Sequence, residues 1–193
     1  METTISLVIA YILGSFDAGV VVPRLMGVDI YAHGSGNPGA SNVMRTLGKK
    51  AGAAVMLVDA LKGLLAALIG ASLVSTTIGF WCGLAAVVGH VFPVWHKFRG
   101  GRGVATAIGA VLFLQPWFGL LLAVAWGATV AVTKTASIAS LGAMVVYVPG
   151  YALFGQRGWS LVAAGLTATL VIVRHSGNIR RLLGGSEQTV ETQ

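Results

Sequence analysis

The stretch AGAAVMLVDALKGLLAALIGASL, residues 51–73, decides the fold class because it is long enough and apolar enough to cross a membrane. A tilted membrane-spanning helix needs roughly 17–25 residues, and this run falls within that range. Across the chain of 193 residues, 55% are hydrophobic and 10% are charged, and the mean hydropathy is +0.82. Soluble domains usually carry about 25% charged residues. The sequence therefore predicts an all-α integral membrane protein.

Six further apolar runs accompany this one, over residues 5–22, 77–91, 103–114, 119–132, 138–154 and 159–173. The first run lacks a basic start and a clear cleavage site, so we expect a membrane span rather than a removed signal peptide. The runs 103–114 and 119–132 are short, and the segment Gln115-Pro116-Trp117 divides them. Fusing these two runs would give six spans, one of them overlong with a proline near its middle.

The distribution of Lys and Arg favours seven spans over six. With seven spans and the N-terminus outside, all but two of the 13 Lys and Arg residues face the cytoplasm, Lys62 lies within a span and only Arg157 lies outside. Cytoplasmic loops are rich in Lys and Arg. We therefore predict seven transmembrane helices in the inner (plasma) membrane, with the C-terminus cytoplasmic. Trp126 falls away from the membrane interfaces in this arrangement and is interpreted as a packing residue.

We expect one domain over residues 1–193, with residues 188–193 as a disordered tail. The one cysteine, Cys82, lies inside an apolar run, so an intrachain disulfide is impossible and a thioester mechanism is disfavoured. No residue spacing suggests a metal site, and we expect no cofactor and no nucleic-acid partner. The sequence indicates no particular oligomeric state.

In the predicted topology, three polar segments rich in glycine all face the cytoplasm. The first is HGSGNPGASNVMR, residues 33–45. Its glycines leave backbone N–H groups uncovered, and Pro38 suits the first position of a helix. A helix that starts near Pro38 would direct free N–H groups into the loop, which is an arrangement that binds anions. Ser41 and Asn42 would share a helical surface with Arg45. The alternative is a flexible loop that only caps the helix.

The second polar segment, GHVFPVWHKFRGGRGVAT, covers residues 89–106 and places Gly100, Gly101 and Gly103 around Arg102. A span begins immediately afterwards, so a helix N-terminus, bare amides and a guanidinium converge. The alternative is a basic stop signal for membrane insertion, but positive charge alone would not need three glycines.

The third polar segment, RHSGNIRRLLGGSE, covers residues 174–187. His175, Asn178 and Arg181 follow one another at intervals of three, so each neighbouring pair can share a helix face. On spacing alone, a binding surface and an ordinary basic tail are equally open.

Polar residues within or beside the spans allow further interpretations. Ser137 and Ser140 are three residues apart. They can serve as small residues for helix packing or as ligand contacts. Asp59 and Lys62 are three apart inside a span, where charges are expensive, so we expect them to pair with each other or with the polar site. His33, His90 and His96 are interpreted as ordinary interfacial residues.

Together these segments resemble the motifs of the bacterial acyl-phosphate:glycerol-3-phosphate acyltransferase family. Residues 34–45 are similar to its motif GSxNxGAxNxxR, residues 89–106 to GHxFPVxxxFxGGKGVAT, and residues 175–187 to HxxNIxRLxxGxE. DALKG at 59–63 and SIAS at 137–140 also look like family features. The likeness covers nearly the whole chain. It implies seven helical spans, an active site facing the cytosol, and transfer of a fatty acyl group from acyl phosphate to glycerol 3-phosphate, giving lysophosphatidic acid.

The resemblance also implies a set of site residues. Catalytic roles fall to Ser35, Arg45, Arg102, His175 and Asn178, and substrate binding to Gly34, Gly36, Asn37, Asn42, Gly100, Gly101, Gly103, Ser137, Ser140 and Arg181. Of these, Arg45, His175 and Asn178 are assigned to glycerol 3-phosphate. The Gly100–Gly103 loop and Ser140 are assigned to acyl phosphate, with Ser35 near the reacting centre.

At three places the chain departs from the usual family pattern. Phe16-Asp17 stands where the family has proline and an aromatic residue, His96 replaces an apolar residue, and Arg102 replaces lysine.

The chemistry fits such a site, because acyl phosphate is already activated and the protein has chiefly to align two molecules and stabilise developing charge. The candidate general bases are His175 and a substrate phosphate. Two alternatives remain at this point. One is a non-enzymatic anion transporter or channel, and the other is an acyltransferase that takes acyl-carrier protein or acyl-coenzyme A as donor.

Overall fold

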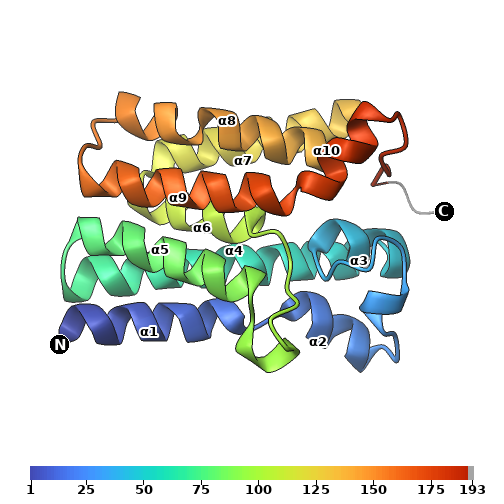
Figure 1. Cartoon of the computed structure of the whole chain (residues 1–193), viewed down its shortest axis with the longest axis horizontal. Coiled ribbons are helices and arrows are strands. Elements are labelled where there is room, and N and C mark those ends of the chain that lie inside the picture. The colour runs from blue at the N-terminus through green and yellow to red at the C-terminus, as the bar shows by residue number, and fades with distance from the viewer. Residues whose placement is uncertain (191–193) are drawn as a thin grey trace.

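The computed structural model describes residues 1–190, and its regular secondary structure over those residues is entirely helical. The α-helices are α1 (Glu2–Ser15), α2 (Ala18–Leu25), α3 (Ala40–Leu47), α4 (Lys49–Leu73), α5 (Thr76–Val91), α6 (Val104–Leu114), α7 (Pro116–Thr133), α8 (Ala136–Leu153), α9 (Trp159–Arg174) and α10 (Ser176–Leu183). Two short 3₁₀ turns, Ile30–Ala32 and Val94–His96, lie in the connections. The long helices run side by side along one axis, and the short helices α2, α3 and α10 gather at the end opposite the N-terminus (Figure 1).

The lengths of the helices suit a membrane protein. Five segments of the described chain are long and apolar enough to cross a bilayer: Glu2–Leu25, Lys49–Leu73, Thr76–His96, Pro116–Thr133 and Ala136–Leu153. The pair α9 and α10, bent by 54° at its break, adds a sixth, and α6 is a shorter apolar helix of 11 residues. The all-helical prediction is therefore confirmed, and every predicted apolar run contains a helix.

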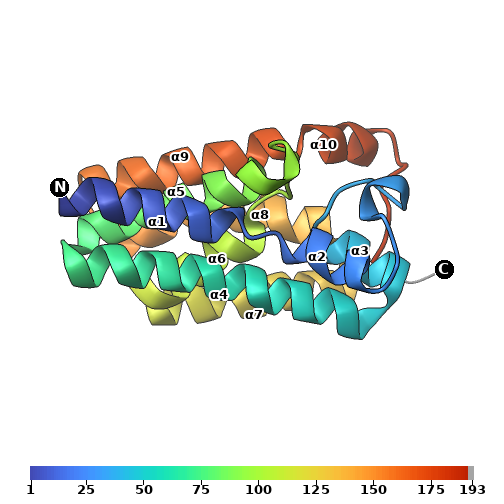
Figure 2. The ribbon, with the colours of Figure 1, turned by 90° about the horizontal axis from the view of Figure 1, so that it is seen from below.

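The first predicted run, residues 5–22, is not one continuous helix. Phe16 and Asp17 adopt extended conformations, with φ of −66° and −107°, and they separate α1 from α2. The Asp17 carboxylate accepts a hydrogen bond from the Gly19 amide at 3.1 Å and caps α2. Figure 2 shows the chain passing between the two helices at this break. The break could not be predicted from the sequence, because one capping aspartate inside an apolar run leaves the mean hydropathy of the run high.

Two buried charges on α4 form the predicted pair. Lys62 Nζ lies 2.8 Å from Asp59 Oδ1, and both side chains are 3% exposed. The interpretation of His90 as an ordinary interfacial residue is wrong, because His90 is buried and its Nδ1 lies 2.8 Å from Lys62 Nζ. Charges inside a span need partners, and His90 on α5 is one of them.

Small residues let α4 and α6 approach each other closely. A Cβ atom at Gly63 would overlap the Thr106 carbonyl, and one at Gly109 would overlap the Ala60 carbonyl. By contrast, α7 packs mainly against α6 and α8, and most of its surface is not covered by the protein. Close α4–α6 packing beside a loosely covered α7 leaves space for a cavity that all three helices line.

Candidate functional site

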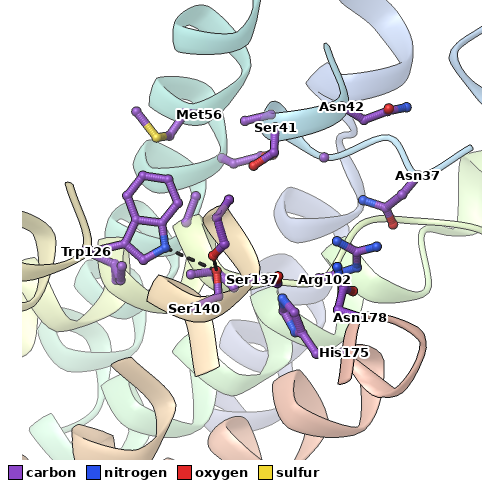
Figure 3. A pocket seen from close by; sticks show the side chains of 18 of the residues that line it. Asn37, Ser41, Asn42, Met56, Arg102, Trp126, Ser137, Ser140, His175 and Asn178 are labelled. Carbon is purple, nitrogen blue, oxygen red and sulfur yellow. Dashed lines mark hydrogen bonds between the residues drawn. The ribbon is translucent and has the colours of Figure 1, made fainter. Parts of the chain in front are cut away.

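A cavity of about 390 Å³ lies where the three polar segments meet the spans. One end is apolar and is lined by Met56 and Leu57 of α4, Ile108 and Leu112 of α6, and Trp126 of α7. The other end is polar. In Figure 3, Met56 and Trp126 lie at one side of the pocket, and Asn37, Arg102, His175 and Asn178 lie at the other. The structure thus brings together segments that are far apart in the sequence.

The first polar segment reaches the cavity through Ser35, Asn37 and Arg45. Helix α3 begins at Ala40 with Gly39 as its N-cap, two residues later than the predicted start near Pro38. Asn42 fixes the loop, because its Oδ1 accepts from the Ser35 amide at 2.9 Å and its Nδ2 donates to the His33 carbonyl at 3.0 Å. Arg45 Nη2 lies 3.5 Å from Ser35 Oγ and 3.4 Å from Asn42 Oδ1. The loop therefore holds the serine and the arginine on the same wall of the cavity.

The second segment contributes Arg102 at the start of α6. Gly103, with φ of +85°, caps α6 in a left-handed conformation that suits glycine. The Arg102 side chain lies between Asn37 on one side and His175 and Asn178 on the other (Figure 3). Burial and the nearby Arg181 guanidinium lower the pKa of Arg102 to about 10, so the side chain keeps its charge at neutral pH.

The third segment is organised by Glu187, a residue with no role predicted from the sequence. Its carboxylate accepts hydrogen bonds from Asn178 Nδ2 at 2.6 Å, Arg181 Nε at 2.9 Å and Ser137 Oγ at 3.1 Å. The signal available was the glutamate that ends the third motif, but a single acid in a basic tail has no spacing partner. Glu187 therefore connects the third segment to α8.

His175 lies at the junction of α9 and α10, and a backbone contact orients its ring. Nδ1 lies 2.7 Å from the Val171 carbonyl, which can only accept, so Nδ1 carries the proton. In the neutral ring, Nε2 is then free to accept a proton or a hydrogen bond.

The chain beyond Glu187 continues across the site. Arg45 Nη1 donates to the Thr189 carbonyl at 3.2 Å, and the Val190 amide donates to the Lys134 carbonyl at 2.7 Å. The predicted disordered tail starts at residue 188; its last residues, 191–193, lie outside the described part of the chain.

Positive charge exceeds negative charge at the polar end. Arg45, Arg102 and Arg181 line the cavity together with Glu187, and the second lining carboxylate, Asp59, is paired with Lys62. Burial lowers the pKa of Arg45, and Glu187 opposes that shift. With Asp59 neutralised by Lys62, three guanidinium groups and the Glu187 carboxylate leave a site that a phosphate group would complete.

Trp126 does more than the predicted packing. It packs against the core, but it also lines the cavity, and its Nε1 donates to Ser140 Oγ at 3.1 Å. Ser140 Oγ in turn donates to the Ala136 carbonyl at 2.7 Å. Ser137 thus contacts Glu187 at the polar end, whereas Ser140 contacts Trp126 at the apolar end.

Four of the predicted glycines lie away from this cavity. Gly36 and Gly100 line an adjoining cavity of about 370 Å³, which shares Ser35, Asn37 and Arg102 with the first. Gly34 and Gly101 line neither of the two. Gly34 has φ of +56°, and a Cβ at Gly101 would overlap the His90 ring, so both have a structural reason to be glycine. The substrate-binding role of all four glycines stays a prediction.

The other predicted site residues line the first cavity: Ser35, Asn37, Asn42, Arg45, Arg102, Gly103, Ser137, Ser140, His175, Asn178 and Arg181.

Residues 4–185 match the family model described as glycerol-3-phosphate acyltransferase. The chain belongs to this family. Curated relatives of that name include a protein of Thioalkalivibrio sulfidiphilus, 44% identical over 94% of this chain and 90% of its own, and one of an Anaeromyxobacter species, 43% identical over 97% of each chain.

Solved structures of a family member agree with this assignment. The chain is 38% identical to PlsY, an integral membrane glycerol 3-phosphate acyltransferase crystallised in a glycerol 3-phosphate form and a lysophosphatidic acid form. The TM-scores are 0.93 and 0.91, and the alignments cover 98% of this chain and 96% and 95% of those chains. Family membership also makes this chain an integral membrane protein.

Proposed function

We propose that this protein transfers a fatty acyl group from acyl phosphate to glycerol 3-phosphate and releases lysophosphatidic acid and inorganic phosphate. One observation carries the proposal: a single cavity joins an apolar groove to a cluster of three arginines. Both substrates bear phosphate and one bears an acyl tail, so one cavity of this kind can hold both molecules. The family relatives named for acyl transfer to glycerol 3-phosphate support the same reaction.

The chemistry needs alignment more than covalent help. The hydroxyl oxygen of glycerol 3-phosphate attacks the acyl carbonyl carbon, the bond from that carbon to the phosphate oxygen breaks, and the hydroxyl proton passes to the departing phosphate. His175 Nε2 is the alternative proton acceptor, since Nδ1 is engaged by Val171. Binding both substrates in one orientation can account for roughly 7–11 kcal/mol of a barrier.

The division of the residues between the two substrates follows the family resemblance. Arg45, His175 and Asn178 bind glycerol 3-phosphate at the polar end. The loop at Gly100–Gly103 binds the phosphate of acyl phosphate through Arg102, and Ser140 lies along the path to the groove. Ser35, held beside Arg45, lies near the reacting carbonyl.

The proposal includes seven crossings, with the polar end at the cytoplasmic face of the plasma membrane. Helix α6, with 11 residues, spans only about 17 Å, against a hydrocarbon core of roughly 30 Å. The loop ahead of it supplies the remaining depth, because Gly100, Gly101 and Gly103 are buried. Irregular backbone is tolerated at membrane depth where protein encloses it or where it lines a cavity.

Cysteine labelling in a Cys82→Ala background tests the orientation. Gln115→Cys, in the α6–α7 turn, should react with an impermeant thiol reagent added to intact cells. Ser186→Cys should react only after the membrane is opened. If both cysteines react from the same side, the chain crosses an even number of times between them and its proposed topology is wrong.

An activity assay tests the reaction itself. Purified protein in detergent receives labelled glycerol 3-phosphate together with one acyl donor in each reaction. The three donors are acyl phosphate, acyl-coenzyme A and acyl-carrier protein loaded with a fatty acyl group. We expect labelled lysophosphatidic acid with acyl phosphate only. If product forms only with acyl-coenzyme A or with the acyl-loaded carrier protein, that molecule is the donor and the proposed donor is wrong. If no product forms with any donor, the enzymatic role is refuted. Anion flux in vesicles without any acyl transfer would favour a transporter.

A further inference from the structure

A buried cluster joins α1, α4 and α5 next to the cavity without being part of its polar end. Lys62 Nζ lies 2.8 Å from Asp59 Oδ1, 2.7 Å from the Phe16 carbonyl oxygen and 2.8 Å from His90 Nδ1. Asp59 and His90 line the cavity wall, whereas Lys62 is absent from its described lining. The lysine thus lies one layer behind the site.

Lys62 makes two hydrogen bonds and one ion pair. A charged lysine donates three hydrogen bonds and accepts none. Lys62 donates to the Phe16 carbonyl and, since it cannot accept, to His90 Nδ1, which places the ring proton on Nε2. Asp59 Oδ1 is its ion-pair partner and also lies 3.4 Å from His90 Nδ1. The Phe16 carbonyl is available because the Val20 amide, four residues later, donates to the Asp17 carbonyl instead, at 3.0 Å. The cluster therefore fixes both the α1–α2 break and the orientation of the His90 ring.

His90 is also the point where the second polar segment folds back on α5. The Gly101 amide donates to the His90 carbonyl, and the Gly100 amide donates to the Val91 carbonyl, both at 3.1 Å. Gly101 lies so close to the ring that a Cβ atom there would overlap His90 Nε2. A shift of the His90 ring toward the loop would therefore displace Gly101 and, one residue later, Arg102.

We propose that Lys62 is a positioning residue that acts through His90 to hold the Gly100–Gly103 loop, and with it Arg102, in the geometry that binds acyl phosphate. The inference rests on the proposed function and deepens it by assigning a role to a residue outside the cavity. Its signature is selectivity. A displaced loop weakens the use of acyl phosphate, whereas Arg45, His175 and Asn178 on other segments continue to bind glycerol 3-phosphate.

The test compares steady-state kinetics for the two substrates in the full-length protein. Lys62→Met keeps a long apolar side chain but loses both hydrogen bonds and the ion pair. It should lower kcat/KM for acyl phosphate by about tenfold, the effect of losing a hydrogen bond to a charged group, and leave the KM for glycerol 3-phosphate within about twofold. Asp59→Asn keeps an acceptor for Lys62 and should lose less activity than Lys62→Met.

Two further variants guard against damage to the fold. Lys62→Met leaves Asp59 unpaired, so the double variant Asp59→Asn/Lys62→Met removes both charges, which buried pairs often tolerate; it should show the same selective loss. Ser6→Ala is the matched control, because Ser6 is buried on α1 and its hydroxyl has no hydrogen-bond partner among residues 1–190. It should behave as the parent.

The outcomes are distinguishable from failure of the proposed function, which would show as an inactive parent. With an active parent, a selective loss for acyl phosphate in both Lys62 variants supports the positioning role. Unchanged kinetics, or equal losses for the two substrates in the double variant, would overturn it.

Discussion

The two ends of the cavity are built in different ways. Side chains at the polar end come from four separate parts of the chain, and hydrogen bonds hold most of them, as Glu187 holds Asn178 and Arg181. The apolar groove is made of aliphatic and aromatic side chains, such as Met56 and Leu112, on three regular helices. Directional contacts fix position, whereas apolar contacts depend mainly on area and shape. The polar end should therefore be sensitive to single substitutions and the groove tolerant of them.

Arg102 should give the largest effect. Arg102→Ala removes a guanidinium from between Asn37 and Asn178, and we expect kcat/KM for acyl phosphate to fall about ten- to over a hundredfold, corresponding to roughly 1.5–3 kcal/mol. Arg102→Lys should keep most of the activity, because the charge remains beside the loop and the N-terminus of α6. If the alanine variant matches the parent, Arg102 has no place in the site; if the lysine variant fails as badly as alanine, the pocket requires the planar fork.

Substitutions in the third polar segment should give the second-largest effect on activity. Asn178→Ala and His175→Ala each remove a polar group from the cavity wall, and we expect kcat/KM for glycerol 3-phosphate to fall by about tenfold. The amount of protein in the membrane should stay near normal. Parent-like activity in both variants would reduce the segment to a basic tail.

A smaller effect is expected at Glu187. Glu187→Gln keeps the shape and one acceptor but removes the charge that faces Arg181, whose side chain is 36% exposed. Such partly exposed pairs contribute roughly 0.2–1 kcal/mol, so activity should fall a few-fold. Glu187→Ala, which leaves Asn178 and Ser137 without their acceptor, should lose more. Equal activity in the two variants would show that the acceptor oxygen does not matter.

The groove should give the smallest effect. Met56→Leu is a volume-conserving change in the apolar wall, and such swaps usually cost less than about 1.5 kcal/mol. We expect kcat/KM for acyl phosphate to change less than about twofold. Met56→Asp, which introduces a charge on the same wall, is the paired variant. A loss with leucine as large as that with Arg102→Ala would erase the contrast between the two ends.

The sequence predicted the helices well because apolar runs and their polar boundaries are local properties. It also predicted the Asp59–Lys62 pair, since both partners lie on one helix at a spacing of three. It could not predict the partnership of Lys62 with His90 and Phe16, which depends on how α1, α4 and α5 pack. The break at Asp17 was missed because its capping hydrogen bond leaves the hydropathy pattern intact.

The candidate site was predictable to the extent that its residues lie in recognisable motifs. Glu187 was missed because its partners Asn178, Arg181 and Ser137 come together only in the folded chain. The structural reason for Gly101 was likewise invisible, because glycine beside an arginine suggests an anion loop as readily as close packing on a histidine ring.

The central claim is that one cavity holds both substrates at once, so that the acyl group passes directly between them. Initial rates measured over a grid of acyl phosphate and glycerol 3-phosphate concentrations test this claim most directly. Direct transfer predicts intersecting double-reciprocal lines, the pattern of a ternary complex. Parallel lines would indicate ping-pong kinetics through a covalent acyl-enzyme and would contradict the account.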